Sequence, residues 1–568
     1  MENENVEILG EKQEIQQPVV EQKNIVEGKD KGKGGKKFGI ILLVLLALAC
    51  IGGGIFYYLT NKDTTSTKVD TNTKKYRSEY RINSNGLENF DLYFLKLENE
   101  EKNKVYSPLS IKYALEMLGE GAGGNSKKQI DAVIGDYKAK SYPNSEHMSF
   151  ANAMFIRNSF KENIVEDYTN NLSSKYGAEI LYDEFSSAQP MNNWAKQKTF
   201  NLIDNFFKDD DVVQSDFILT NALAIDMNWN NQIHCAEGGK APCVNDGRYG
   251  ISYAHEKLDD DSKSSYGVTE YPYIGEGAFY GDQYQNRKNE FNGKENNKGA
   301  TVLADFNKYD IIKELGEDKI RELIRPEYEA WLKTADGKSA MREEFPTNVD
   351  EYVNKFIKEL KENYGKAANS TDFLIYEDDN VKEFAKELQE YDGVTLQYVG
   401  IMPKNEKLTD FVKNTDKDSL NKLIDGLKEV KIDNFEEGYA TRIRGFIPFF
   451  DFEYELKLKE DLQELGIKDV FDSKKADLSG MLKNPNGEFI GTASHKATIE
   501  FSNDGIKAAA VTSFGGYGSA RGPYFEHLFK VPVKDIDISF NKPYMYIIRD
   551  KATGEVWFTG TVYEGITK

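Results

Sequence analysis

Residues 495–522 constrain the possible folds of this chain more than any other stretch. Residues 497–501 alternate in the β-branched and aromatic pattern of a strand, and residues 502–505 (SNDG) are typical of a turn. In residues 506–514 every second side chain is apolar or small, whereas Lys507 falls on the other face. This segment could add a strand to a sheet with its apolar face inward. A loop or a helical turn remains open, because small side chains order weakly and alanine favours helix.

The N-terminal part predicts a membrane-anchored chain. Residues 1–37 are polar and are expected to form a disordered cytoplasmic tail. Residues 38–59 carry no charge and are long enough to span about 30 Å of hydrocarbon as a helix. The lysines before this span orient the tail inward and the rest outward. A cleaved signal peptide, or a lipid-modified Cys50, is the alternative.

After a linker at residues 60–78, the composition indicates a soluble globular part. The whole chain has 568 residues, a net charge of −21 and a pI near 5.0. This acidity argues against nucleic acid as a partner, which favours a basic surface. Aromatic residues make up 12% of the chain, which suits a sheet-rich core, and three cysteines exclude a disulfide-dense scaffold.

The cysteines and histidines raise two other possibilities near residue 240. His234, Cys235, Cys243 and His255 could hold a metal, but their spacing is unlike the usual ligand pattern. We expect no metal and no cofactor. If this part lies outside the cell, a disulfide between Cys235 and Cys243 is favoured over two free thiols. The sequence contains no nucleophile-elbow pattern and only five histidines, so nothing in it supports an enzyme.

A series of short segments resembles the serpins, the protease inhibitors that insert a cleaved loop into their own sheet. Residues 495–514 resemble the hinge and reactive loop of that family, and residues 105–111 (VYSPLSI) resemble another of its signatures. Further matching blocks follow in the family's order. They are residues 119–124, 152–156, 193–194, 219–223 with Trp229, 445–448, 465–471, 476–481 and 541–550, with Gly554 and Gly560.

The resemblance implies an α+β serpin fold over residues 79–568. Such a fold has a large central β-sheet, two smaller sheets and eight or nine helices, here behind an N-terminal transmembrane helix. The family pattern disappears around residues 232–370, which we interpret as an inserted subdomain. Within it, residues 311–324 and 349–364 have helical spacing.

The resemblance also implies roles for residues of the reactive loop. The hinge would comprise Gly505, Ile506, Lys507, Ala508, Ala509, Ala510, Val511 and Thr512. Counting from the hinge places the cleaved bond at Ser519–Ala520, with Arg521 as the alternative. Counting back from Pro543 places it near Lys530, because this loop is longer than usual.

Four polar residues resemble the shutter, the group that holds the central sheet closed in serpins. They are Ser107, Ser110, Asn221 and His495. Buried polar groups of this kind must be paired. We therefore expect Asn221 and His495 on neighbouring strands of the largest sheet, within hydrogen-bonding reach of each other.

The function implied by the resemblance is inhibition of a target protease, of the serine class or else the cysteine class. Two departures from the family weaken this expectation. Ile506 stands where inhibitory serpins usually have Thr or Ser, and Asn503 stands where they usually have Glu. The alternative is a non-inhibitory serpin fold that serves as a cell-surface binding or adhesion module.

Overall fold

The computed structural model describes residues 78–230, 243–244, 254–255, 290–295, 297–340, 342, 345–364, 373–502, 505–506 and 530–567. The chain divides into two units, residues 1–71 and 72–568, and all of the described residues belong to the second. The expected membrane span at 38–59 lies outside the described residues. Among the helices that are described, none is long and apolar enough to cross a membrane.

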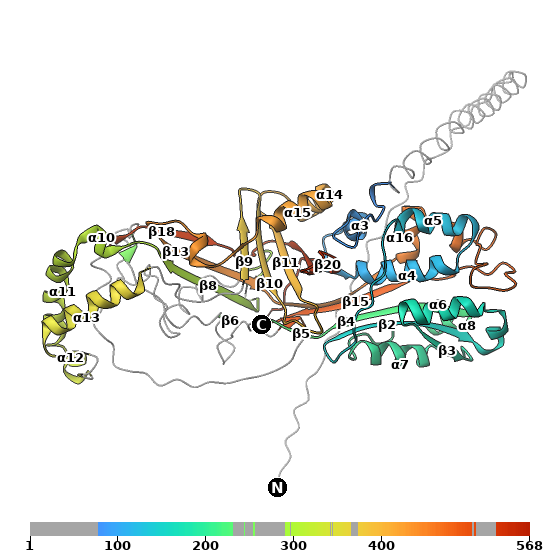
Figure 1. The fold of residues 1–568 in the computed structure, drawn as a ribbon, viewed down its shortest axis with the longest axis horizontal. Coiled ribbons are helices and arrows are strands. Elements are labelled where there is room, and N and C mark those ends of the chain that lie inside the picture. Colours follow the sequence, from blue (N-terminus) through green and yellow to red (C-terminus); the bar gives the residue numbers. More distant parts are fainter. Residues whose placement is uncertain are drawn as a thin grey trace, which may run out of the picture. The chain divides into compact units, whose positions relative to one another are not determined.

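The largest sheet has seven strands and is antiparallel throughout (Figure 1). Its strands, in spatial order, are β1 (Lys104–Tyr106), β20 (Val556–Val562), β19 (Tyr544–Asp550), β11 (Leu396–Pro403), β10 (Val381–Glu387), β9 (Phe373–Glu377) and β12 (Lys428–Glu429). All residues of β11 and β20 are buried. Strands buried on both faces carry near-continuous apolar sequence, and this sheet forms the centre of the main hydrophobic core.

Two shorter sheets lie near the predicted hinge. One contains β3 (Glu179–Asp183), β2 (Met148–Arg157) and β4 (Phe217–Ile225), in that order. The other contains β14 (Phe450–Leu456), β15 (His495–Phe501), β16 (Gly505–Ile506) and β5 (Met227–Asn228). In β15 alternate residues are buried, which agrees with the predicted strand and extends it by two residues toward the N-terminus.

A further four-stranded sheet uses part of the expected insertion. Its order is β18 (Val533–Asp537), β13 (Ala440–Pro448), β8 (Gly299–Asn307) and β6 (Cys243–Val244). A separate parallel pair joins β7 (Ala254–His255) to β17 (Lys530–Val531). Residues 232–370 are thus joined to the rest of the domain by strand pairing, because β6 and β8 lie within this sheet.

The described residues contain thirteen α-helices, more than the eight or nine expected. Nine lie outside the insertion: α3 (Asn89–Leu97), α4 (Pro108–Gly121), α5 (Gly124–Ile134), α6 (Glu166–Tyr176), α7 (Gln189–Lys198), α8 (Asp209–Val213), α14 (Leu408–Asn414), α15 (Lys417–Gly426) and α16 (Leu458–Leu465). Short 3₁₀ turns are η1 (Asn158–Asn163), η3 (Ile432–Asn434) and η4 (Asp469–Phe471). Helix α4 begins as its sequence predicts, with Pro108 in the first turn and Ser107 accepting a hydrogen bond from Ser110 N.

The other four helices form a unit with its own hydrophobic core. They are α10 (Ile311–Leu315), α11 (Glu317–Trp331), α12 (Ala335–Ser339) and α13 (Val349–Asn363). The core is built mainly from Ile320, Ile324 and Tyr328 of α11 and from Val353 and Ile357 of α13. The two helical stretches expected from the sequence therefore pack against each other, and the insertion accounts for the additional helices.

Candidate functional site: the gap between β4 and β15

Strands β4 and β15 do not pair with each other, and a gap separates them. Strand β4 pairs with β2 on one edge, and β15 pairs with β14 along its whole length. On the other edge of β15, among the described residues, only Phe501 has a strand partner. A cavity of about 780 Å³ lies between the two strands and is lined also by α4 and α16.

The hinge enters one end of this gap. Ile506 pairs with Phe501 of β15 on one side and with Met227 of β5 on the other. Its side chain is 3% exposed. A side chain on Gly505 would collide with Met227 O, so glycine permits the close approach of β16 to β5. The first hinge residues, Gly505 and Ile506, are therefore already part of a sheet.

Trp229, the residue that follows β5, contacts the turn that leads into the hinge. Its indole N–H donates to Ser502 O at 2.9 Å. The Ser502 N–H donates to Gly505 O at 3.1 Å, which forms the turn between β15 and β16. Trp229 is fully buried, and its ring packs edge-on against Phe501.

The rest of the predicted loop lies outside the described residues. This part includes Lys507, Ala508, Ala509, Ala510, Val511, Thr512, Ser519, Ala520 and Arg521. The roles assigned to these residues stay predictions.

His495 lies at the other end of β15 and bonds to α4. The Ser107 N–H donates to His495 Nε2 at 2.9 Å. His495 is 8% exposed, and burial lowers its pKa to about 4. The ring is therefore neutral near pH 7, with Nε2 as the acceptor and the proton on Nδ1.

Asn221 belongs to a second group of polar side chains, on the β4 side of the gap. Ser110 Oγ donates to Asn221 Oδ1. Asn221 Nδ2 donates to Asn152 Oδ1 at 2.7 Å. Asn152 in turn donates to Tyr176 O at 2.8 Å, so this group ties β4 to β2 and α4.

The expected direct pair of Asn221 and His495 is wrong for this structure. The two residues lie on different sheets, and neither sheet is the largest one. No hydrogen bond joins them in the described part of the chain; each instead bonds to the first turn of α4, through Ser110 and Ser107 respectively. The physical reason is the gap, because an unpaired β4 and β15 cannot bring side chains at 221 and 495 together.

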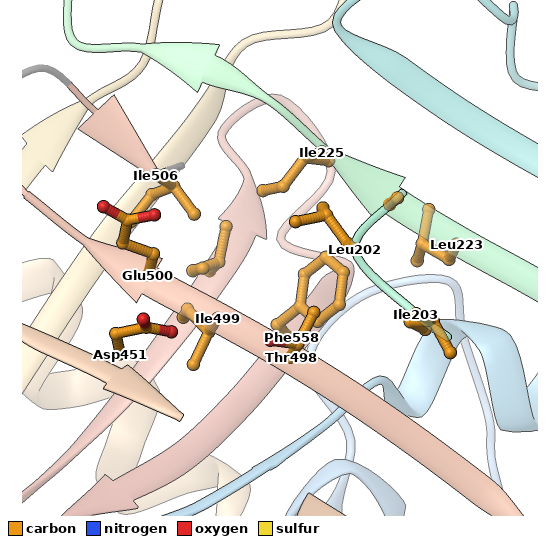
Figure 2. Close-up of a pocket in the computed structure, with 12 residues that line it drawn as sticks. Leu202, Ile203, Leu223, Ile225, Asp451, Thr498, Ile499, Glu500, Ile506 and Phe558 are labelled. Atoms are coloured by element: carbon orange, nitrogen blue, oxygen red, sulfur yellow. The ribbon is translucent and has the colours of Figure 1, made fainter. Parts of the chain in front are cut away.

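Sequence analysis missed one segment that lines this gap, residues 199–208 after α7. Leu202 and Ile203 from this segment line a smaller cavity at the hinge end, together with Ile506. Figure 2 shows Leu202, Ile225 of β4 and Ile499 of β15 among the residues that line this smaller cavity. No periodic pattern marks this segment in the sequence.

The possible metal site or disulfide near residue 240 involves side chains that lie outside the described part of the chain. His234 and Cys235 lie outside the described residues, and only the backbone of Cys243 and His255 is described, in β6 and β7. Within the described residues, no three His, Cys, Asp or Glu side chains group in a way that could hold a metal ion.

Comparison with known proteins identifies relatives of this chain. The family model described as "Serpin (serine protease inhibitor)" matches residues 89–242 and 368–565. Human leukocyte elastase inhibitor is 29% identical over 172 residues, which are 30% of this chain and 41% of that protein. Iripin-1 of Ixodes ricinus is 29% identical over 30% of this chain and 38% of its own. These first relatives are thus matched over less than half of their length.

Longer matches have lower identity. Human neuroserpin is 20% identical over 82% of this chain and 87% of its own. The solved structure of the thermophilic serpin tengpin in its native state has a TM-score of 0.50, with 20% identity, and covers 84% of this chain and 93% of its own. Thyroxine-binding globulin in complex with thyroxine has the same TM-score at 15% identity, over 86% of this chain and 98% of its own. Because the family model covers more than half of the chain, this protein belongs to the serpin family.

Proposed function

We propose that this serpin inhibits a protease by inserting its cleaved reactive loop into the gap between β4 and β15. The observation that carries the proposal is the position of Gly505 and Ile506, which are paired between β15 and β5 at one end of the gap. A strand that has started in this position can lengthen by further pairing along both open edges.

Extending the register of β16 supports this mechanism. Two residues further along, position 508 falls opposite Ile499 and Ile225, and position 510 falls opposite Ala497 and Leu223. These neighbours are buried or line the gap. Ala508 and Ala510 are small enough for such places, and in an inserted strand Lys507 and Ala509 would point to the other face.

The same register brings the end of the inserted strand to the polar groups of the gap. Position 512 falls opposite both His495 and Asn221. The residue there is Thr512, whose hydroxyl can both donate and accept. Insertion would therefore offer a partner to polar side chains on the two sides of the gap.

The target is proposed to be a serine protease, with cysteine proteases as the second class. Family membership and the human leukocyte elastase inhibitor among the relatives support this class. In the mechanism, the protease forms an acyl-enzyme at the cleaved bond, and insertion moves it away before water completes hydrolysis.

A non-inhibitory binding module is the second candidate. Ile506 and Asn503 depart from the inhibitory pattern, and a thyroxine complex among the solved structures carries the same fold. The two candidates differ in the fate of the protease. The chain is incubated with trypsin-, elastase- and subtilisin-like proteases and run on a denaturing gel. Inhibition should give a stable covalent complex between the chain and a protease. Clean cleavage without a complex would favour the binding module.

The chain is also proposed to be tethered to a membrane by residues 38–59, with residues 79–568 outside. The uncharged span and the lysines that precede it support this orientation. Protease treatment of intact cells should release the large domain. Protection of the domain until the cells are lysed would contradict the orientation.

A further inference from the structure

A lysine and an aspartate are paired in the interior of the domain. Asp91 lies on α3 and Lys112 on α4, and Lys112 Nζ is 2.6 Å from Asp91 Oδ1. Both side chains are 0% exposed. The pair of Lys196 and Asp204, in contrast, is 42% and 51% exposed. Removing two charges from water is costly unless well-formed hydrogen bonds compensate for the lost hydration.

The contact between Lys112 and Asp91 does not have the geometry of a hydrogen bond. Neither Lys112 Nζ nor Asp91 Oδ1 has a hydrogen-bond partner within the described residues, although the two atoms are in contact. Their distance suits a hydrogen bond, so it is the angles at these atoms that do not. A buried ammonium group whose donors are all unused is unfavourable. The pair is therefore poorly explained as an ordinary ion pair.

The second carboxyl oxygen of Asp91 is held by the backbone. The Glu88 N–H donates to Asp91 Oδ2 at 2.8 Å, as part of the cap of α3. A donor in this position stabilises the negative charge that develops on the oxygen when a nucleophile attacks the carboxyl carbon. Burial, opposed by Lys112, raises the pKa of Asp91 from 3.8 to about 6. This carboxyl group therefore takes up a proton more readily than an exposed aspartate does.

A third ionisable side chain, Glu555, is buried beside the pair. It directly precedes β20, against which both α3 and α4 pack. Its Oε2 accepts from Tyr142 OH at 2.6 Å and lies 3.7 Å from Lys140 Nζ, whereas its Oε1 is buried without a hydrogen-bond partner in the described structure. Glu555 is close enough to Asp91 to contribute to its raised pKa. Its Oε1 is therefore available to accept a proton near the pair.

Aromatic side chains surround the pair and keep water away from it. The ring of Tyr137 lies 5.6 Å from Lys112 Nζ. Tyr106 OH donates to Asp91 O, and the Tyr106 ring packs edge-on against Phe94. Tyr137, Tyr106 and Phe94 are all fully buried. A site that excludes water favours a condensation reaction and protects its product from hydrolysis.

We infer that Lys112 and Asp91 form an intramolecular amide bond that links α3 covalently to α4. A proton first passes from the Lys112 ammonium to the Asp91 carboxylate. The uncharged amine then attacks Asp91 Cγ, so that a C–N bond forms and the bond from Cγ to Oδ1 breaks. Glu555 takes one proton from the attacking nitrogen and passes it to Oδ1, which already carries the carboxyl proton and leaves as water. The reaction needs no oxidant, cofactor or second substrate.

The amide bond accounts for the burial of this lysine and aspartate. It replaces two buried charges by one neutral group. It also closes a loop in the unfolded chain, which stabilises the fold in the way that a disulfide does. The link does not depend on whether the protein inhibits a protease.

The test is a peptide map of the full chain, purified, denatured and digested with trypsin. Mass spectrometry should find residues 82–96 joined to residues 105–127, without cleavage after Lys112 and with a mass one water below the sum of the two peptides. Fragmentation of the joined peptides should place the link at Asp91 and Lys112. The exposed pair of Lys196 and Asp204, 2.9 Å apart, is the matched control, and trypsin should cleave after Lys196.

Two variants of the full chain test the chemistry. Lys112→Met keeps an unbranched side chain without the amine, so its intact mass should be that of its sequence, with no water lost. Glu555→Gln keeps both partners of the bond but removes the proton acceptor. It should leave the peptides largely unjoined, because proton transfer by a positioned side chain contributes about a hundredfold or more to the rate of such a step.

The wild-type digest decides the question even if neither variant folds. Separate peptides 82–96 and 105–112 at their unshifted masses would overturn the amide bond and leave a buried ion pair. A link placed at other residues would overturn it as well. Complete joining in Glu555→Gln would overturn the role given to Glu555.

Discussion

The seven-stranded sheet and the two short sheets beside the gap are built from similar residues but are paired to very different extents. In the large sheet, β11 and β19 are paired on both edges over most of their length. Beside the gap, β4 and β15 each have one edge that is largely unpaired within the described residues. Near-continuous apolar sequence is present both in β11 of the large sheet and in β4 beside the gap, so side-chain pattern alone does not explain the difference.

This difference indicates where further strand pairing can still stabilise the native fold. Each ladder hydrogen bond contributes about 0.5–1.5 kcal/mol net. A sheet whose central strands are fully paired can form few further ladder hydrogen bonds, whereas the gap can accept a whole strand. The following predictions test that contrast, beginning with the largest expected effect.

Cleavage of the reactive loop should stabilise the protein markedly. Insertion of residues 507–514 would pair both edges of the gap, and the Tm should rise by about 10 °C or more. Differential scanning calorimetry of intact and cleaved protein measures the change. Ala510→Arg, which puts a charge on the inward face, should abolish the rise, because an unpaired buried charge is costly.

Ala509→Arg is the matched control for this experiment. In an inserted strand residue 509 would point to the opposite face, so this variant should keep the full rise in Tm. Equal melting temperatures of intact and cleaved wild type would mean that the gap does not accept the loop.

The large sheet carries a buried carboxyl group that should make it sensitive to alkaline pH. Glu383 on β10 is fully buried, and neither carboxylate oxygen has a hydrogen-bond partner in the described structure. Burial, with a smaller contribution from Asp378, raises its pKa from 4.5 to about 8. The folded state therefore holds this proton more tightly, so the contribution of Glu383 to stability is complete below pH 4.5 and is lost as the pH rises from there through 8.

Glu383→Gln should be more stable than the wild type by about 2–4 kcal/mol at pH 9, and the difference should shrink toward pH 4. Urea unfolding across this pH range measures it. A difference that does not depend on pH would show that ionisation of Glu383 is not its cause.

The same glycine substitution should have unequal effects in the two regions. At Gly560 in β20, an added Cβ would collide with Lys104 O of β1, in the middle of paired strands. Gly560→Ala should cost about 3 kcal/mol of unfolding free energy. Gly505→Ala collides with Met227 O but disturbs only the two-residue strand β16, so it should cost about 1 kcal/mol while displacing the hinge.

Gly491→Ala is the control, because a Cβ there would meet no atom within 4 Å. Denaturant unfolding gives the three stabilities, and the fluorescence of Trp229, which bonds to the turn before β16, reports the hinge. Equal costs at 505 and 560 would contradict the contrast between the sheets.

His495→Ala should lower the free energy of unfolding by about 1–3 kcal/mol, because it leaves the Ser107 N–H without its acceptor. The pKa of His495 is depressed from 6.5 to about 4. Its contribution is therefore complete above pH 6.5 and is lost as pH falls toward 4. Thermal melts from pH 7.5 to 4 should show the difference between variant and wild type shrinking; a constant difference would rule out titration of His495.

Local structure was predictable from the residues that determine it. Pro108 is typical of the first turn of a helix, as in α4, and the alternation in residues 497–501 predicted β15. The apolar spacing in residues 311–324 and 349–364 predicted helices that α10, α11 and α13 confirm. Each of these features depends on neighbours within a few positions along the chain.

The strands that border the gap, and the bonds that their residues form, were not predictable from neighbouring residues in the sequence. The expectation that Asn221 and His495 would bond directly was wrong, although each residue lies beside the gap and bonds to the first turn of α4. The segment 199–208 gave no signal, because its position depends on bonds to α7 and on the space left between two sheets.

By itself, the sequence determined which faces of the strands and helices are apolar, where α4 begins, and that Ile506 can enter a sheet. Only the tertiary structure decided that β4 and β15 stay apart, that Ile506 is already paired between β15 and β5, and that Leu202 and Ile203 line a cavity together with Ile506. The physical reason is that strand pairing uses backbone groups that nearly every residue carries. Which edges meet is therefore set by long-range packing, which a local pattern does not encode.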